Sequence, residues 1–236
     1  MILSHKHKFI FIHCRKVAGS SISAWLARHL GPDDLMIGSW VDAVSAGAEI
    51  NVRMRRELQS PKGIRILSGI SHSSKDSYSV SEMNLAYKQY YGDTIPGKPA
   101  FPRAEVLKDW VGDVWDEYTK FCFVRNPYDR AVSDWLWRTR KARKRDIEFS
   151  EFLRRISDAG RPDPENVVPE PPTNWPLYTV SDKVVVDFVG RFETLLLDCA
   201  RIGKEIGIPF APEDLPNAKR NTERKRDYRH ISANKK

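Results

Sequence analysis

Short apolar runs alternate with amphipathic stretches along the first part of the chain. Residues 8–13 (KFIFIH) are rich in aromatic and β-branched side chains, which is typical of a buried strand. A loop of small residues follows. Residues 22–30 then place Ile22, Trp25 and Leu26 on one face of a helix, which a Gly-Pro pair ends. The pattern therefore predicts a unit of strand, short loop and helix.

The same alternation continues toward the C-terminal part of the chain. Further strands are predicted at 63–70, 118–124 and 183–189, and helices at 80–91, 104–115, 127–144, 149–156 and 193–206. The proline-containing stretches 92–102 and 158–176 are predicted to be loops. Strands that alternate with helices favour an α/β fold. We therefore expect a single α/β domain over residues 1–236, with a mostly parallel central sheet flanked by helices.

The composition is that of an ordinary globular protein, with 41% hydrophobic and 30% charged residues. No apolar run approaches the roughly 20 residues that a membrane span needs, and no secretory leader is visible at the start. The three cysteines lack metal-ligand spacing. We therefore expect buried, reduced thiols, no metal site and a cytoplasmic location.

Positive charge is the strongest compositional signal, because the formal net charge is +8. It is concentrated at residues 138–145 (RTRKARKR) and 219–230 (KRNTERKRDYRH). Such a charge favours an anionic partner, which could be a nucleic acid, an acidic glycan, a phosphorylated cofactor or a membrane surface. A solvated helix face or a loose tail would account for the same runs.

The first candidate site is the sequence HCRKVAGSSI at residues 13–22, which follows the first predicted strand. Backbone N–H groups at the start of the next helix favour an anion there, and Lys16 adds a full positive charge. Gly19 would let the backbone approach a ligand closely. The ATP-binding pattern G-x-x-x-x-G-K-[ST] is absent. A tight strand–helix turn with an exposed lysine is the structural alternative.

The second candidate site is the sequence FCFVRNPYDRAVSDW at residues 121–135. Arg125 would leave the end of the third predicted strand, at the edge where open α/β sheets bind ligands. Ser133 would lie about two turns into the next helix, so the guanidinium and the hydroxyl can converge on a phosphate. A structural arginine that closes the loop is the alternative.

Together these two stretches resemble the sulfotransferases, whose 5′-phosphosulfate loop reads H-x-P-K-T-x-G-[ST]-[ST] and whose 3′-phosphate motif reads F-V-R-[DN]-P-[YWF]-x-R-x-x-S. The resemblance is closest to the carbohydrate branch, which includes heparan- and chondroitin-modifying enzymes. Residues 146–156, 186–208 and 215–231 resemble later segments of that family in the same order. The resemblance implies a P-loop-like sulfotransferase fold and the donor 3′-phosphoadenosine-5′-phosphosulfate (PAPS), with no metal required.

The resemblance also implies roles for single residues. Lys16 matches the lysine on the sulfate-bridging oxygen, and Arg125 and Ser133 match the pair on the 3′-phosphate. The matches to the loop around the 5′-phosphosulfate are Arg15, Val17, Ala18, Gly19, Ser20 and Ser21, and those to a C-terminal loop that closes over the nucleotide are Arg220, Asn221 and Thr222. Arg15 departs from the family proline and Val17 from the frequent threonine. An arginine there could stiffen the loop or contact an anionic acceptor.

Sulfuryl transfer to a hydroxyl also needs a base, and histidine titrates in the useful range. His72 follows a predicted strand in the sequence SGISHSS and resembles the turn that carries the base in some glycan sulfotransferases. Glu82 and Glu105 are the alternatives. The expected reaction is an in-line displacement at sulfur, in which Lys16 and loop amides stabilise the leaving 3′,5′-ADP.

The acceptor is expected to bear a hydroxyl, and the basic runs hint at an anionic glycan or a lipid headgroup. The two predicted loops at 92–102 and 158–176 are the expected specificity segments, because loops on a rigid scaffold usually carry recognition. A nucleotide kinase with an aberrant phosphate loop, a non-catalytic module that binds polyanions or nucleic acid, and an inactive homologue are the rival interpretations.

Overall fold

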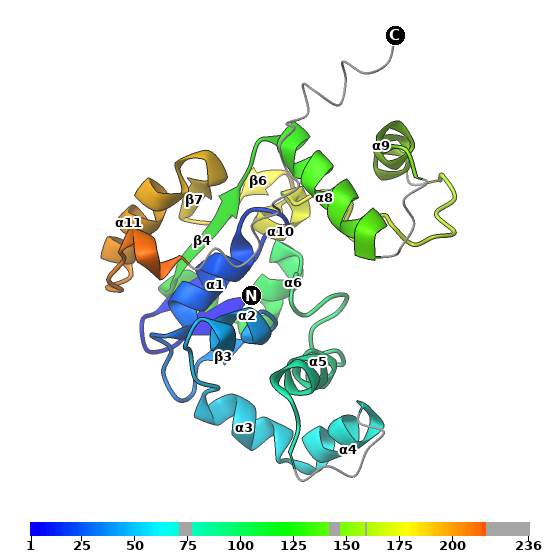
Figure 1. Ribbon diagram of the computed structural model, residues 1–236. Helices are drawn as coiled ribbons and strands as arrows, with labels where there is room; N and C mark the ends of the chain where they lie inside the picture. Colours follow the sequence, from blue (N-terminus) through cyan, green and yellow to red (C-terminus); the bar gives the residue numbers. More distant parts are fainter. Residues whose placement is uncertain (71–76, 142–146, 159, 216–236) are drawn as a thin grey trace.

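The protein is built on a five-stranded mixed sheet. The computed structural model describes residues 1–70, 77–141, 147–158 and 160–215. In spatial order the strands are β3 (Leu35–Met36), β1 (Ile2–Ser4), β2 (Phe9–Ile12), β4 (Thr119–Val124) and β7 (Phe188–Arg191). A separate two-stranded sheet pairs β5 (Thr179–Val180) with β6 (Lys183–Val184). Within the described ranges, helices surround the central sheet (Figure 1).

Three parallel strands form the half of the sheet that matters for function. β2 pairs with β4, which places Ile12 opposite Cys122, and β4 pairs with β7, which places Val124 opposite Arg191. The carboxyl ends of parallel strands meet at one edge of a sheet, where ligands bind in open α/β folds. The segments that follow β2, β4 and β7 therefore leave the same edge of the sheet.

The expectation of a mostly parallel sheet is wrong, because β1 runs antiparallel to both of its neighbours. A tight turn at residues 5–8, in which Lys8 adopts a φ of 50°, returns the chain from β1 to β2. Antiparallel neighbours need only such a short connection, whereas parallel ones need a crossover. β1 was not predicted because it has three residues, too few to show a period.

Residues 63–70 do not form the predicted strand but lie in the helix α4. The helices are α1 (Gly19–Ala27), α2 (Trp40–Ser45), α3 (Val52–Leu58), α4 (Pro61–Ile70), α5 (Val80–Tyr90), α6 (Ala104–Val111), α7 (Val114–Glu117), α8 (Pro127–Lys141), α9 (Phe149–Ser157), α10 (Trp175–Tyr178) and α11 (Leu195–Glu205). In α4, Gly63 and Leu67 are buried and Ile66 and Ile70 pack on the core, which is the spacing of one helix face. A short apolar run is compatible with a buried strand and with a buried helix face.

Two other predicted elements are divided. Residues 183–189 contain the whole of β6 and the start of β7 rather than one strand. Asp187 joins β4 between them, since its N–H donates to the Lys120 carbonyl at 2.8 Å and its carboxylate accepts from the Lys120 N–H at 2.7 Å. The helix predicted at 104–115 is broken by Gly112, which has a φ of 60°.

The main core lies between the sheet and its helices. Its largest fully buried side chains include Trp25, Trp40, Tyr87, Phe9 and Phe121. The thiols of Cys14, Cys122 and Cys199 are buried, as the sequence predicted. Burial raises the pKa of the Cys199 thiol to about 12.

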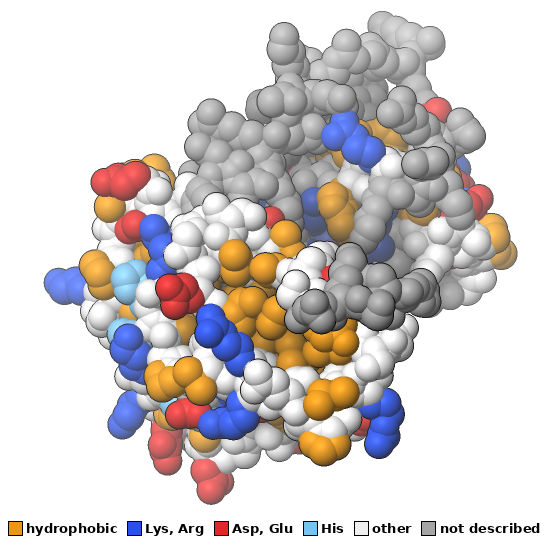
Figure 2. Space-filling view, turned by 60° about the horizontal axis from the view of Figure 1, so that its bottom comes forward, with side chains coloured by type: hydrophobic (Ala, Val, Ile, Leu, Met, Phe, Trp, Pro, Cys, Tyr) orange, Lys and Arg blue, Asp and Glu red, His pale blue; other side chains and the backbone are white. Residues whose placement is uncertain are grey.

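Hydrophobic side chains also gather on the outside of the helices at one end of the molecule. Figure 2 looks toward the end that carries α3 and α4 and shows apolar side chains grouped there. Val52, Ile64 and Leu85 are 55%, 54% and 46% exposed in α3, α4 and α5. Among the helices of the described ranges, none is both long and apolar enough to cross a membrane.

Candidate functional site

The loop between β2 and α1 has an unusual backbone. Lys16 and Ala18 both adopt a φ of 63°, in the left-handed region that residues with a Cβ avoid. Ala18 is the N-cap of α1, and its carbonyl accepts from the Ser21 N–H at 2.9 Å. The Val17 side chain is fully buried, so only the backbone of this residue can reach a ligand. Such strain persists where the surrounding structure enforces it, and it is common at ligand-binding sites.

The His13 ring supports the conformation of this loop by packing against Gly19. Its ring lies 5.9 Å from the Phe11 ring and 5.0 Å from the Phe101 ring, measured between centroids. A Cβ at Gly19 would lie 2.1 Å from His13 Nε2. The glycine is therefore required for close packing on the imidazole, a reason that the sequence analysis did not find.

Arg15 turns away from the loop and binds the segment 170–174. Its guanidinium donates to the carbonyl oxygens of Glu170 and Thr173 at 3.1 and 3.2 Å, and also to that of Pro171. Its backbone exchanges two hydrogen bonds with the Asn174 side chain, of 3.1 and 2.9 Å. Burial lowers the pKa of Arg15 to about 10. Arg15, which stands where the resembled motif has a proline, thus connects the first motif to the predicted specificity loop at 158–176.

Arg125 leaves the end of β4 and meets the first motif. Its Nη1 donates to the Lys16 carbonyl at 3.4 Å. On its other side the guanidinium carbon lies 4.1 Å from the centroid of the Phe192 ring, which follows β7. The structure therefore brings together the two motifs that lie 109 residues apart in the sequence.

The helix α8 carries the rest of the second motif. Ser133 is half-buried on it. One turn further, the Trp137 ring lies 5.3 Å from Lys16 Nζ. Asp134 is 1% exposed and pairs with Arg138 at 2.9 Å and with Arg130 at 3.8 Å. Its single negative charge is therefore shared between two arginines.

Basic side chains also converge where the two predicted specificity loops meet. Arg103, which directly follows the first of these loops, pairs at 2.7 Å with Glu170 of the second. Lys98 lines a small cavity of about 50 Å³ there together with Phe101 and Pro171. Partial burial lowers the pKa of Lys98, and the charges of Arg138 and Arg15 lower it further. The first motif therefore adjoins a region with several positive charges.

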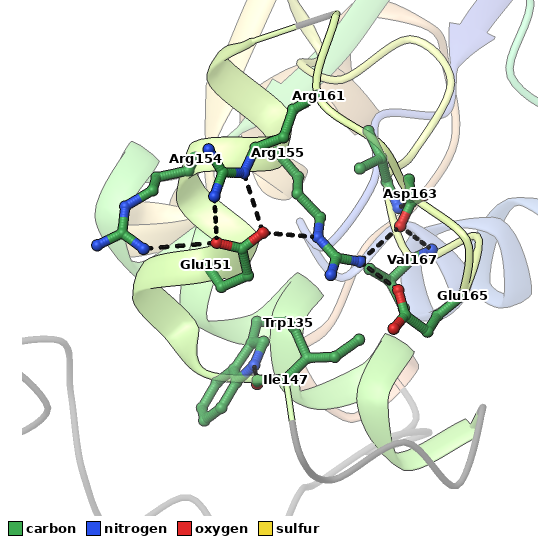
Figure 3. Close-up of polar contacts among 10 residues, drawn as sticks. Trp135, Ile147, Glu151, Arg154, Arg155, Arg161, Asp163, Glu165 and Val167 are labelled. Atoms are coloured by element: carbon green, nitrogen blue, oxygen red, sulfur yellow. Dashed lines mark hydrogen bonds and ion pairs between the residues drawn. The ribbon is translucent and has the colours of Figure 1, made fainter.

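The long loop after α9 is held by an ion-pair network (Figure 3). The Glu151 carboxylate accepts from Arg155 and Arg161 at 3.0 and 2.8 Å. Arg155 in turn bonds Asp163 at 3.1 Å and also Glu165. Beneath the network is a second small core, which comprises Ile147, Phe152 and Val167. The loop is thereby anchored before it reaches the residues that bind Arg15.

Several predicted residues lie outside the described residues, namely His72, Arg220, Asn221 and Thr222. Across the described ranges, no group of three or more His, Cys, Asp and Glu side chains could hold a metal ion. A larger cavity of about 450 Å³ lies between β7 and α11, where Phe188, Arg191 and Arg201 are among its lining residues. Lys16 and Arg125 do not line it.

The fold and the site thus define an α/β protein in which the loop around Lys16 and the segment that begins at Arg125 meet at one edge of the sheet. The chain matches the family described as "Sulfotransferase family" over residues 1–236, and it belongs to that family. An uncharacterized protein of Archaeoglobus fulgidus is 34% identical over 134 residues, which are 54% of this chain and 98% of that protein. No solved structure matches the chain.

Proposed function

We propose that this sulfotransferase takes the sulfuryl group from PAPS and transfers it to an acceptor hydroxyl. The observation that carries the proposal is the 3.4 Å contact between Arg125 and the Lys16 carbonyl. It supports one continuous binding site, in which the loop around Lys16 holds the 5′-phosphosulfate and Arg125 with Ser133 holds the 3′-phosphate. Arg220, Asn221 and Thr222 would close over the nucleotide, with residues 1–236 forming one domain.

The proposed reaction is a single displacement at sulfur. The acceptor oxygen attacks the sulfur atom, the bond from sulfur to the bridging phosphate oxygen breaks, and 3′,5′-ADP leaves. His72 takes the proton of the acceptor hydroxyl. Lys16 stabilises the negative charge that develops on the bridging oxygen, which needs no metal ion. The Arg15 side chain holds segment 170–174 in place, and the loop backbone rather than this side chain contacts the donor.

We further propose that the acceptor carries a negative charge near its reacting hydroxyl, as an acidic glycan or a lipid headgroup does. Lys98 and Arg138 support this proposal, because the charge of Arg138 lies close enough to lower the pKa of Lys98 and that of Arg15 in the first motif. Asp134 offsets part of the charge of Arg138. An anionic group on the acceptor would offset the remainder.

Labelled PAPS and a matched pair of acceptors test both proposals. We expect transfer of the label to p-nitrophenyl β-glucuronide to exceed transfer to the neutral p-nitrophenyl β-glucoside. The Lys16→Ala variant should lower turnover roughly a hundred- to thousandfold, because charge stabilisation in the transition state is lost. Equal turnover by Lys16→Ala would refute the role of the lysine. A preference for the neutral glycoside would refute the anionic acceptor and leave the donor assignment intact.

A further inference from the structure

The segment that follows β7 lies beside the 3′-phosphate motif. Val124, the last residue of β4, is paired in register with Arg191, the last residue of β7. The next residues, Arg125 and Phe192, therefore leave the sheet edge side by side. Residues Phe192–Thr194 form a single 3₁₀ turn, labelled η1, before α11 begins.

Two contacts connect this turn to the motif. The Arg125 guanidinium lies over the Phe192 ring at 4.1 Å. The Glu193 carboxylate accepts a hydrogen bond from the Asn126 N–H at 2.8 Å. Asn126 uses its own side chain to accept from the Tyr128 N–H at 3.0 Å, at the start of α8. Both residues at the centre of the motif are therefore held from the same side.

The turn is itself held firmly. Asp198 of α11 is 5% exposed. Its Oδ2 accepts from the Arg191 N–H at 2.9 Å and from the Thr194 hydroxyl at 2.6 Å. These bonds hold the residues on both sides of Phe192. The Phe192 ring is therefore held in place against Arg125.

A guanidinium is planar, and a ring that lies against one of its faces limits how the side chain can rotate. The Phe192 ring covers one face of Arg125, and the Lys16 carbonyl accepts from one edge at 3.4 Å. The ring therefore restricts the orientation in which the guanidinium meets phosphate oxygens. Without the Phe192 ring, the Arg125 side chain would have to lose more rotamer freedom when a ligand binds.

We infer that Phe192 and Glu193 are positioning residues that set the preference of the site for a nucleotide with a 3′-phosphate. This inference rests on the proposed function, since it assigns the orientation of Arg125 in the same nucleotide site. Phe192 acts through the plane of the guanidinium, and Glu193 acts through the backbone of Asn126. Neither residue is assigned a contact with the reacting atoms.

Calorimetric titrations with 3′,5′-ADP and with 5′-AMP, which lacks the 3′-phosphate, test the inference. Phe192→Leu keeps an apolar side chain but removes the aromatic face. We expect it to weaken 3′,5′-ADP binding by about three- to thirtyfold, the range of a cation–π contact. The affinity for 5′-AMP should change less than about twofold, because this nucleotide makes no contact with Arg125. Phe192→Tyr keeps the face and should restore the wild-type preference.

A matched control is Phe188→Leu, the same substitution at the first residue of β7, where the ring packs against Phe123. It should leave the ratio of the two affinities unchanged. Glu193→Gln should lower the ratio less than Phe192→Leu does. If Phe192→Leu lowers the affinity for both nucleotides equally, or lowers neither affinity, the positioning role is wrong. A wild-type protein that binds 5′-AMP as well as 3′,5′-ADP would instead overturn the proposed function.

Discussion

Replacement of Gly19 by alanine is the change for which the structure predicts the sharpest local conflict. The added Cβ would lie 2.1 Å from His13 Nε2 and 2.2 Å from its Cδ2. The His13 ring has little room to move, because it is 8% exposed and lies between Phe11 and Phe101. Either this ring or the loop that contains Lys16 must therefore shift.

Two opposing effects decide the magnitude. At the start of a helix, alanine in place of glycine stabilises a protein by about 0.4–1 kcal/mol when the backbone is compatible. Overpacking of a buried site costs about 1–3 kcal/mol. We therefore expect Gly19→Ala to lower the free energy of unfolding by about 1.3 kcal/mol, the difference between the midpoints of these ranges. For a chain of this size the melting temperature should fall by roughly 3–5 °C.

A double-mutant cycle with His13→Ala isolates the conflict. Once the imidazole is removed, Gly19→Ala should be neutral or stabilising, which gives a coupling energy of about 1–3 kcal/mol. Gly69→Ala in α4 is the matched control, because its Cβ would meet nothing within 4 Å. Urea unfolding measures all five proteins, including the wild type. If Gly19→Ala is as well tolerated as Gly69→Ala, the packing argument is wrong.

Two further substitutions test the connections of the long loop. Arg15→Met keeps an unbranched apolar side chain but removes the guanidinium and its bonds to three carbonyls, and it should lower the free energy of unfolding by about 2–4 kcal/mol. Each hydrogen bond to a charged group contributes about 1.5–3 kcal/mol, and part of their sum is offset because burial favours the neutral side chain. A change below about 0.5 kcal/mol, the usual limit for surface sites, would contradict this role. Hydrogen bonds from Arg161 and Arg155 lower the pKa of Glu151 to about 2. Its stabilising contribution is thus present above the unfolded pKa near 4.5 and lost as the pH falls toward 2. Glu151→Gln should flatten the dependence of the urea midpoint on pH in that window, and an unchanged dependence would show that the network does not stabilise the fold.

The sequence predicted the parts of the fold in which the local pattern and the tertiary structure agree. The strands β2 and β4 and the helices that follow them are apolar or amphipathic over enough residues to show their period. The run at 63–70 was misassigned because eight residues rich in isoleucine and leucine satisfy both a strand and a buried helix face. The antiparallel β1 and β3 were missed because two or three residues carry no period.

The sequence predicted the parts of the candidate site that lie within the two motifs. The convergence of the Lys16 loop and Arg125 followed from strand ends that share one edge of the sheet. The partners of Arg15 could not be predicted, since they are carbonyl oxygens more than 150 residues away and carbonyls have no sequence signature. The stacking of Phe192 on Arg125 depends on the register of β4 and β7, which the pattern of single strands does not encode.

The measurement that tests the central claim most directly is a calorimetric titration of the wild-type protein with 3′,5′-ADP, with ATP·Mg²⁺ as the control. We predict micromolar binding of 3′,5′-ADP, which corresponds to about 8 kcal/mol, and no comparable binding of ATP·Mg²⁺. Tight binding of ATP·Mg²⁺ with none of 3′,5′-ADP would contradict the assignment and favour a nucleotide kinase. Binding of neither nucleotide would contradict a preformed donor site at Lys16 and Arg125.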